Sequence, residues 1–579
     1  MRRADDLGDT PPAPAEESEP RHEWPTGTDR TTRLTLRDLA FAFAAWSFGA
    51  LVFFRSAFGS GFDKIMGDVG DARFLVFVSE HWVHVLRGYE SWTSPSFYFP
   101  IKGVLGYSDT LILNELFYAP LRAAGCDEFL AFQWTIVLMS LSGFLALFAL
   151  LRRTMGLSVT VCVALASAVV FANAMYVKAS HAQLYSLYWL PVVMLMMHHA
   201  LMDVRRLVKI AWGLASGVTV GLLFVSTYYI AWFAVVSVAI FSGVLLALRV
   251  SAVGLRSCAA SLGRQIGVAG GFLLGFVLAM IPFAIVYLPA LRASGGRSYS
   301  EAMLYAARPA DIVNLGGANY LWGSLMRTTL SDGRLANGEV SLAVTPILLI
   351  SALTLGAVLI RRRRSGHSVV GDVGIAAAVT LGALVLLPVK FGWGSAWRVL
   401  WTLVPGAVGI RAVDRIVLLG GLFAVVVIGA SLSLLSKVMF VSPWPRRFSR
   451  VVASALLFVV VVEQLNMSER SFIDRSDELS ALRTSPAPPP LCESFFIIDS
   501  SPTPVPFYQS SIDAMLISQH FRLPTVNGYS GQFPVGYSLI DPGAPGYLDQ
   551  VHLWADSHNL RDGLCSYDRA TRTWAVPGA

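Results

Sequence analysis

Long apolar runs separated by short polar connections dominate the first 465 residues. A helix needs roughly 20 apolar residues to cross the hydrocarbon core of a membrane. The runs that reach or approach this length lie at residues 39–58, 129–151, 157–177, 184–201, 210–227, 228–248, 266–288, 340–360, 372–389, 415–436 and 451–465. This pattern predicts an all-α polytopic membrane protein with about eleven transmembrane helices.

The charge of the polar connections predicts the orientation. If the N-terminus is cytoplasmic, each connection on the cytoplasmic side is basic, with arginine or lysine within residues 152–153, 205–209, 249–264, 361–364 and 437–450. Basic residues are retained on the cytoplasmic side during insertion. We therefore expect a multi-pass protein of the cytoplasmic (inner) membrane, whose odd number of spans places the C-terminus outside.

The expected outer side contains most of the remaining polar sequence. Three long connections, 59–128, 289–339 and 390–414, lie there, and residues 466–579 follow the last span. A strand-like run at Ser494–Ile498, a possible helix and a stretch rich in glycine and proline predict a small extracytoplasmic α/β domain. The expected organisation is a disordered cytoplasmic tail (1–37), a transmembrane domain (38–465) and this C-terminal domain (466–579).

Composition supports the membrane assignment and limits the partners. Hydrophobic residues make up 54% of the chain and charged residues 14%, whereas soluble domains carry about 25% charge. The net charge of +7 comes largely from the basic connections, so it does not indicate a nucleic-acid partner. Five cysteines are too few for a disulfide framework. Cys492 and Cys565 flank the C-terminal domain in an oxidising compartment, where they form either a disulfide, which we predict, or two buried thiols.

An acidic loop follows the first span and contains the first candidate chemistry. Asp63, Asp68 and Asp71 lie there beside Gly67 and Gly70. On one helical turn Asp68 and Asp71 share a face. Such carboxylates can bind a divalent cation, Mg²⁺ or Mn²⁺, or act as a general base. The alternative is structural, because Asp71 can cap a helix over residues 72–86.

Four further polar residues lie in the outer connections. Asp109 follows Tyr-Ser and either caps the next helix or contacts a substrate. His181 and Gln183 either reach a sugar hydroxyl or phosphate, or anchor the membrane interface together with neighbouring aromatic residues. Glu301 lies in a loop that mixes charged and aromatic residues, which fits a carbohydrate-facing surface and a solvated surface equally.

Arg411 and Arg415 stand at the outer start of the tenth span. Helix N-termini attract anions and arginine binds phosphate in a bidentate manner, so a lipid phosphate is a natural ligand; snorkelling towards lipid headgroups is the alternative. Elsewhere, glycines at every fourth position predict close helix packing. They are Gly213, Gly217, Gly221, Gly267, Gly271 and Gly275.

The order of these features resembles the bacterial GT-C superfamily of membrane glycosyltransferases over about residues 38–436. The features are Gly67-Asp68-x-Gly70-Asp71, Tyr107-Ser108-Asp109, His181-x-Gln183 followed by Trp189-Leu190-Pro191, a large loop after the seventh span, and Pro405-Gly406 before Arg411 and Arg415. The resemblance implies an enzyme that transfers a sugar from a polyprenyl-phosphate donor to a glycan, lipid or protein acceptor.

In this superfamily an aspartate in the first outer loop acts as a base or metal ligand. That role carries over to Asp63, Asp68 or Asp71, and the Gly-Asp pairs favour the last two. Arg411 and Arg415 are the candidates to stabilise the leaving phosphate. The second outer loop has no acidic pair like that of a metal-dependent oligosaccharyltransferase, which leaves metal dependence open.

Two other functions fit a polytopic membrane protein. One is a transporter or flippase for a lipid-linked glycan or a solute; the other is a non-catalytic subunit of an envelope-glycan assembly system. Carriers place ionisable residues at mid-membrane and often break helices there. Here the charges gather at the outer margin and we expect unbroken spans, which favours the enzyme.

Overall fold

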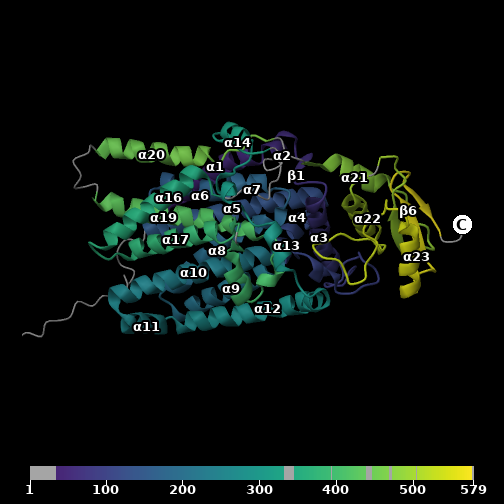
Figure 1. The fold of residues 1–579 in the computed structure, drawn as a ribbon, viewed down its shortest axis with the longest axis horizontal. Helices are drawn as coiled ribbons and strands as arrows, with labels where there is room; N and C mark the ends of the chain where they lie inside the picture. Colours follow the sequence, from purple (N-terminus) through teal and green to yellow (C-terminus); the bar gives the residue numbers. More distant parts are fainter. Residues whose placement is uncertain are drawn as a thin grey trace, which may run out of the picture.

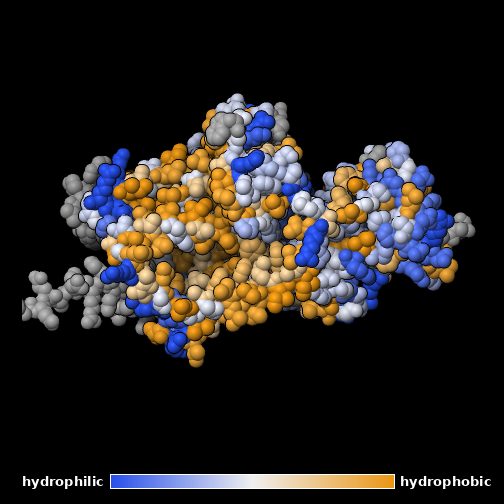
Figure 2. All heavy atoms as spheres, turned by 60° about the horizontal axis from the view of Figure 1, so that its bottom comes forward, coloured by the Kyte–Doolittle hydropathy of each residue, from blue (hydrophilic) through white to orange (hydrophobic). Residues whose placement is uncertain are grey.

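An elongated helical bundle carries a small mixed domain at one end (Figure 1). The computed structural model describes residues 34–331, 344–392, 394–438, 446–468, 472–503 and 505–576. The predicted cytoplasmic tail up to residue 33, and residues 332–343 with the start of the predicted eighth span, lie outside these ranges. On the face seen in Figure 2, apolar residues cover much of the bundle and hydrophilic residues gather mainly toward its two ends.

Within the described residues, nine helical segments are long and apolar enough to cross a membrane. They are α1 (Leu36–Phe53), α5 (Glu128–Met155), α6 with α7 (Val159–Val170, Asn173–Val177), η3 with α8 (Ala182–Tyr188, Trp189–Met202), α9 (Arg206–Ser226), α10 (Tyr228–Val253), α12 (Ile266–Ser294), α17 (Val369–Leu386) and η7 with α19 (Val413–Leu419, Gly420–Val438). These segments confirm a predominantly helical, multi-pass membrane protein.

The other two predicted spans correspond to helices of the same bundle that are not among these nine. α16 (Pro346–Arg363) packs against α17 and α19, and α20 (Arg446–Val462) packs against α6. α16 ends in arginines, and the apolar part of α20 covers only Val451–Val462. The total of eleven therefore stays a prediction.

Shorter elements connect these helices and form the domain at the end. The helices are α2 (Arg55–Gly59), α3 (Asp71–Leu86), η1 (Val104–Tyr107), η2 (Ile112–Asn114), α4 (Glu115–Ala123), α11 (Leu255–Gly263), α13 (Tyr299–Leu304), η4 (Pro309–Val313), α14 (Gly323–Thr329), α18 (Trp397–Leu403), η6 (Ala407–Gly409), α21 (Arg475–Thr484), α22 (Phe507–Phe521) and α23 (Tyr547–His558). The strands are β1 (Lys64–Met66), β2 (Lys390–Phe391), β3 (Gly394–Ser395), β4 (Phe472–Asp474), β5 (Ser494–Ile498), β6 (Leu564–Asp568) and β7 (Thr573–Ala575).

One span is interrupted and two others begin with a 3₁₀ segment, so the spans are less regular than the unbroken helices expected from the sequence. α6 and α7 are separated at residues 171–172, and 3₁₀ segments precede α8 and α19. Lys178, just after α7, lies 3.6 Å from Asp414 in η7, and both side chains are buried. Short 3₁₀ segments and a buried ion pair of this kind also occur in carriers, so helix continuity does not separate the two functions.

α9 and α12 pack with their backbones in close contact, which confirms the role predicted for the glycines. A Cβ atom on Gly217 would lie 2.0 Å from the carbonyl oxygen of Phe272, and one on Gly275 would lie 2.3 Å from that of Leu214. Any larger side chain would push the two helices apart. α12 is thereby held rigidly, and its end forms one wall of the site described below.

The last hundred residues form a small three-stranded sheet with helices, as the sequence predicts. β5 pairs parallel with β6, and β6 pairs antiparallel with β7. Cys492 and Cys565 form a disulfide that links the start of β5 to β6 across 73 residues. We refer to residues 472–576 as the tail domain.

The tail domain is attached tightly to the first long connection. β1 pairs antiparallel with β4 in the register Lys64↔Asp474. Backbone hydrogen bonds join residues 96–99 to 525–527, including Phe99 N to Thr525 O at 3.0 Å and Thr525 N to Ser96 O at 2.9 Å. The buried Arg73 of α3 adds ion pairs to Glu478 and Asp513. The tail domain is thus a fixed wall of the molecule.

Candidate functional site

A cavity of about 430 Å³ lies where the bundle meets the tail domain. Its walls come from the start of α3, the loop before η2, the start of α10, the end of α12, η7, and residues 529–533 of the tail domain. Nine residues were expected from the sequence to bind substrate or act in catalysis, and six of them line this cavity. These are Asp71, Asp109, His181, Gln183, Arg411 and Arg415.

Asp71 is the first residue of α3, and both of its carboxylate oxygens have a partner. Oδ2 lies 2.6 Å from Nδ1 of His181, and Oδ1 accepts a hydrogen bond of 3.0 Å from the hydroxyl of Tyr529. Burial raises the pKa of Asp71, but the bond to His181, the bond from Tyr529 and the charge of Arg415 outweigh it and lower the pKa below its usual value. The carboxylate is therefore ionised at neutral pH.

The structure places Asp63 and Asp68 outside the lining of the cavity. Oδ1 of Asp68 accepts hydrogen bonds from the amides of Gly70 (3.1 Å) and Ala72 (3.2 Å), so this residue, and not Asp71, satisfies amides at the start of α3. Asp63 accepts from the amide of Ser476 at 3.0 Å and so helps to attach α21. Of the three aspartates, only Asp71 faces the cavity.

Asp109 reaches the cavity through a strained loop. Its Oδ1 accepts from the amide of Tyr228, the first residue of α10, at 3.1 Å, so it does not cap the helix that follows it in sequence. Thr110 donates to the carbonyl of Val225 at 2.8 Å, and Leu111 adopts a left-handed backbone with φ of 55°. Such strain persists where surrounding contacts impose it. Burial raises the pKa of Asp109 to about 6, although the Tyr228 amide and Arg415 oppose this shift.

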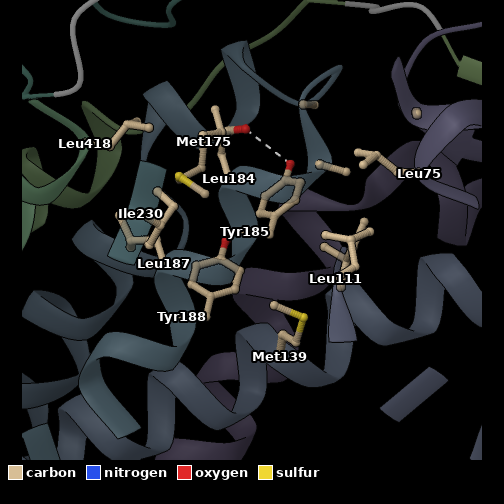
Figure 3. Packing of buried hydrophobic residues seen from close by; sticks show 14 of the residues in the cluster. Leu75, Leu111, Met139, Met175, Leu184, Tyr185, Leu187, Tyr188, Ile230 and Leu418 are labelled. Atoms are coloured by element: carbon tan, nitrogen blue, oxygen red, sulfur yellow. Dashed lines mark hydrogen bonds between the residues drawn. The ribbon is translucent and has the colours of Figure 1, made fainter. Parts of the chain in front are cut away.

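The turn that carries His181 and Gln183 is held by buried aromatic residues. Tyr185 and Tyr188 pack inside the bundle, and the hydroxyl of Tyr185 donates to the carbonyl of Met175 at 3.1 Å (Figure 3). Trp189 is also buried and donates to Asn114 at 3.2 Å. These aromatic residues therefore position the turn from within, which is not the interfacial anchoring considered as an alternative.

The two predicted arginines approach the cavity from the loop before α19. The amide of Arg411 donates to the hydroxyl of Tyr229 at 2.7 Å, and its guanidinium lies 5.1 Å from the centre of the Tyr305 ring. Arg415 is only 9% exposed. Gly406 permits the preceding turn, since its φ is +84° and a Cβ would lie 2.1 Å from the hydroxyl oxygen of Tyr228. Both arginines thus line a protein cavity, an arrangement that snorkelling to lipid does not explain.

Glu301 lies beside the site and does not line it. Its Oε1 forms an ion pair of 2.5 Å with Arg297, and Arg297 lines the cavity and donates to the carbonyl of Gly531 at 2.7 Å.

The sequence analysis assigned no role to the residues of the tail domain that line the cavity. The available signal was the Gly528-Tyr529-Ser530-Gly531 sequence within a stretch already noted for glycine and proline.

The described residues do not form a metal centre. No group of three or more histidine, cysteine, aspartate or glutamate side chains among them is arranged to hold a metal. In the cavity both oxygens of Asp71 already accept hydrogen bonds, and three arginines, 297, 411 and 415, supply positive charge. These side chains fit an anion better than a divalent cation. Asp332 and Glu339 of the predicted outer loop lie outside the described residues.

Comparisons with known proteins found fold neighbours only. No family model matches the chain, and no curated protein is significantly similar to it. Among solved structures, an oligosaccharyltransferase of Archaeoglobus fulgidus, in complex with Zn and sulfate, aligns with a TM-score of 0.44 and 13% identity over 91% of this chain and 67% of its own. ArnT of Cupriavidus metallidurans, bound to undecaprenyl phosphate, aligns with a TM-score of 0.38 and 12% identity over 84% of each chain.

Proposed function

We propose that this protein is a membrane glycosyltransferase that moves a sugar from a polyprenyl-phosphate donor to an acceptor hydroxyl on the outer side of the cytoplasmic membrane. The observation that carries the proposal is the convergence in one cavity of an ionised, histidine-paired Asp71, the carboxyl of Asp109 and two arginines. A base beside an anion site is what glycosyl transfer from a phosphate requires.

Asp71 is the proposed general base. It takes the proton of the acceptor hydroxyl while the acceptor oxygen forms a bond to the anomeric carbon of the sugar. The bond between that carbon and the phosphate oxygen breaks, and its electron pair leaves with polyprenyl phosphate. The imidazole of His181, 2.6 Å from Oδ2, keeps the carboxylate oriented during this step.

Arg411 and Arg415 are the proposed phosphate ligands. Charge builds up on the phosphate as the glycosidic bond breaks, and guanidinium groups fixed in a buried cavity stabilise that charge without having to reorganise. Arg415 is already among the charges that act on Asp71 and Asp109. Base and phosphate site are therefore electrostatically coupled. The apolar wall of α12, with Phe283, Leu288 and Leu291, suits a lipid-linked donor.

The remaining residues that line the cavity are suited to contact a carbohydrate. Tyr107, Tyr228, Tyr229, Phe507 and Phe533 surround it and offer ring faces and hydroxyl groups. Gln183 adds an amide whose oxygen is buried without a hydrogen-bond partner. A sugar ring, with apolar faces and polar edges, satisfies both kinds of surface. The acceptor is in our proposal a glycan, a lipid or a protein of the cell envelope.

The experiment that tests this function measures chemistry and transport together. The full-length protein is reconstituted in liposomes with radiolabelled polyprenyl-phosphate sugars and an envelope-lipid extract as acceptor. We expect a labelled product with at least one donor, and no product from Asp71→Asn. If no donor yields a product while a labelled lipid or solute crosses the bilayer, the protein is a carrier. If neither activity appears, the third possibility, a non-catalytic subunit, is favoured over our proposal.

A further inference from the structure

Asp71 receives a hydrogen bond from each of two parts of the chain. The hydroxyl of Tyr529, in the tail domain, donates to Oδ1 at 3.0 Å, while His181 of the bundle contacts Oδ2. Burial, together with the nearby charge of Asp71, raises the pKa of Tyr529, so its phenol remains a proton donor at neutral pH. The rotation of the carboxyl group is therefore fixed from both sides.

The position of Tyr529 is itself fixed by packing. Its ring meets the ring of Phe74 edge to face at 5.8 Å and lies 6.0 Å from that of Tyr508. Its amide donates to the sulfur of Met515 at 3.3 Å. A side chain with two well-packed faces and a fixed backbone delivers its hydroxyl to one place at little entropic cost.

The loop around Tyr529 is attached to the bundle at both ends. On one side lies Tyr98. A Cβ atom on Gly528 would lie 2.5 Å from the ring of Tyr98, so position 528 requires glycine. The hydroxyl of Ser530 lies 3.2 Å from the hydroxyl of Tyr98. On the other side, Arg297 donates to the carbonyl of Gly531 at 2.7 Å. The first outer connection and the segment after α12 thus hold the loop that presents Tyr529.

We propose that Tyr529 is a positioning residue, through which the tail domain orients the catalytic carboxylate of Asp71. This inference rests on the proposed function for the identity of the base. The phenol occupies a lone pair of Oδ1 and limits which of the remaining lone pairs can meet an acceptor hydroxyl. In this role the tail domain completes the active site, beyond any part it has in binding the acceptor.

The test compares Tyr529→Phe with Tyr508→Phe. Each variant removes one hydroxyl from the tail domain, but Tyr508 neither lines the cavity nor contacts Asp71. For Tyr529→Phe we expect kcat to fall about tenfold, with an unchanged KM for the donor. The acid limb of the pH–rate profile should move to higher pH, because a carboxylate that loses a hydrogen-bond donor binds its proton more tightly. Tyr508→Phe should behave as the unmodified protein.

Infrared spectroscopy separates failure of this inference from failure of the proposed function. The carbonyl band of protonated Asp71, identified by its loss in Asp71→Asn, should appear at higher pH in Tyr529→Phe than in the unmodified protein. If this band appears at the same pH in the two proteins, or if kcat and the acid limb of the pH–rate profile are unchanged in Tyr529→Phe, the positioning role is wrong. If the unmodified protein transfers no sugar but the band still shifts, the hydrogen bond stands and the proposed function fails.

Discussion

Nδ1 of His181 lies 2.6 Å from Oδ2 of Asp71, although 110 residues separate the two in sequence. The pair joins the first long connection to the turn before α8, and it stands at the wall of the cavity. A histidine beside a carboxylate is a common way to orient a group that handles protons. This contact defines the centre of the proposed site, and the predictions below start from it.

Asp71→Asn and Asp68→Ala should have opposite effects on activity and stability. Loss of the base should lower the rate of sugar transfer about a hundredfold or more, with little change in stability. Loss of the Asp68 hydrogen bonds should cost about 1 kcal/mol of stability and leave most of the activity. Steady-state rates of sugar transfer measure the activity of both variants, and thermal unfolding measures their stability. Equal activity of the two variants would remove Asp71 from the mechanism.

Arg411→Ala and Arg415→Ala should weaken donor binding. A hydrogen bond to a charged group contributes about 1.5–3 kcal/mol, so the donor KM should rise by about ten- to a hundredfold. Arg398→Ala is the matched control, since Arg398 also lies over a tyrosine ring, that of Tyr299, but does not line the cavity. If the donor KM is unchanged in both test variants, these arginines do not bind the donor and their role is structural.

Asp109 should make donor binding sensitive to pH. Its folded pKa of about 6 lies above the ordinary value, so it is neutral below pH 6 and negative above it. The negative form repels the donor phosphate bound by Arg415. As the pH rises through about 6, the donor KM should rise by about fivefold, as roughly 1 kcal/mol of repulsion implies. In Asp109→Asn this dependence should disappear; if it persists there, another group titrates.

The disulfide of the tail domain should contribute to its stability. Closing a loop of this length lowers the entropy of the unfolded chain and is worth roughly 3–5 kcal/mol. Cys492→Ser and Cys565→Ser should each destabilise the protein to thermal unfolding, whereas Cys126→Ser, at an unpaired cysteine, is the control. Mass spectrometry of non-reduced peptides tests the bond directly. Two alkylatable thiols in the folded protein would contradict it.

The orientation in the membrane remains to be tested. We predict a cytoplasmic N-terminus and an outer tail domain, because each expected inner connection is basic. In the structure α11, which contains Arg256 and is followed by Arg264, lies at the opposite end from the tail domain (Figure 1). A phosphatase fused after residue 579 should be active and a cytosolic reporter silent. The reverse result would mean that the tail domain and the proposed site lie on the cytoplasmic side of the membrane.

The sequence was sufficient for the features that depend on local patterns. Apolar runs predicted the spans, glycines at every fourth position predicted the contact of α9 with α12, and short polar motifs identified six of the residues that line the cavity. Spacing alone could not decide which of Asp68 and Asp71 accepts from the amides at the start of α3 and which faces the cavity. That choice depends on His181 and Tyr529, two partners that are distant in sequence.

Two further features could not be predicted because they are imposed by tertiary contacts. Asp109 is drawn to the start of α10 by a loop whose left-handed Leu111 is held by α9. The irregular segments α7 and η7 accompany the buried pair of Lys178 and Asp414. Neither a strained residue nor an interrupted helix leaves a clear mark on hydrophobic periodicity.

The attachment of the tail domain also sets an order of events during biosynthesis. Tyr529 is synthesised 458 residues after Asp71, and a ribosome makes about 5–20 residues per second. The bundle can therefore insert, and its arginines can meet lipid phosphates, well before the hydroxyl that orients Asp71 exists. On our proposal, a nascent chain would bind donor without consuming it, and activity would begin only when the last hundred residues had folded onto the loop at residues 96–99.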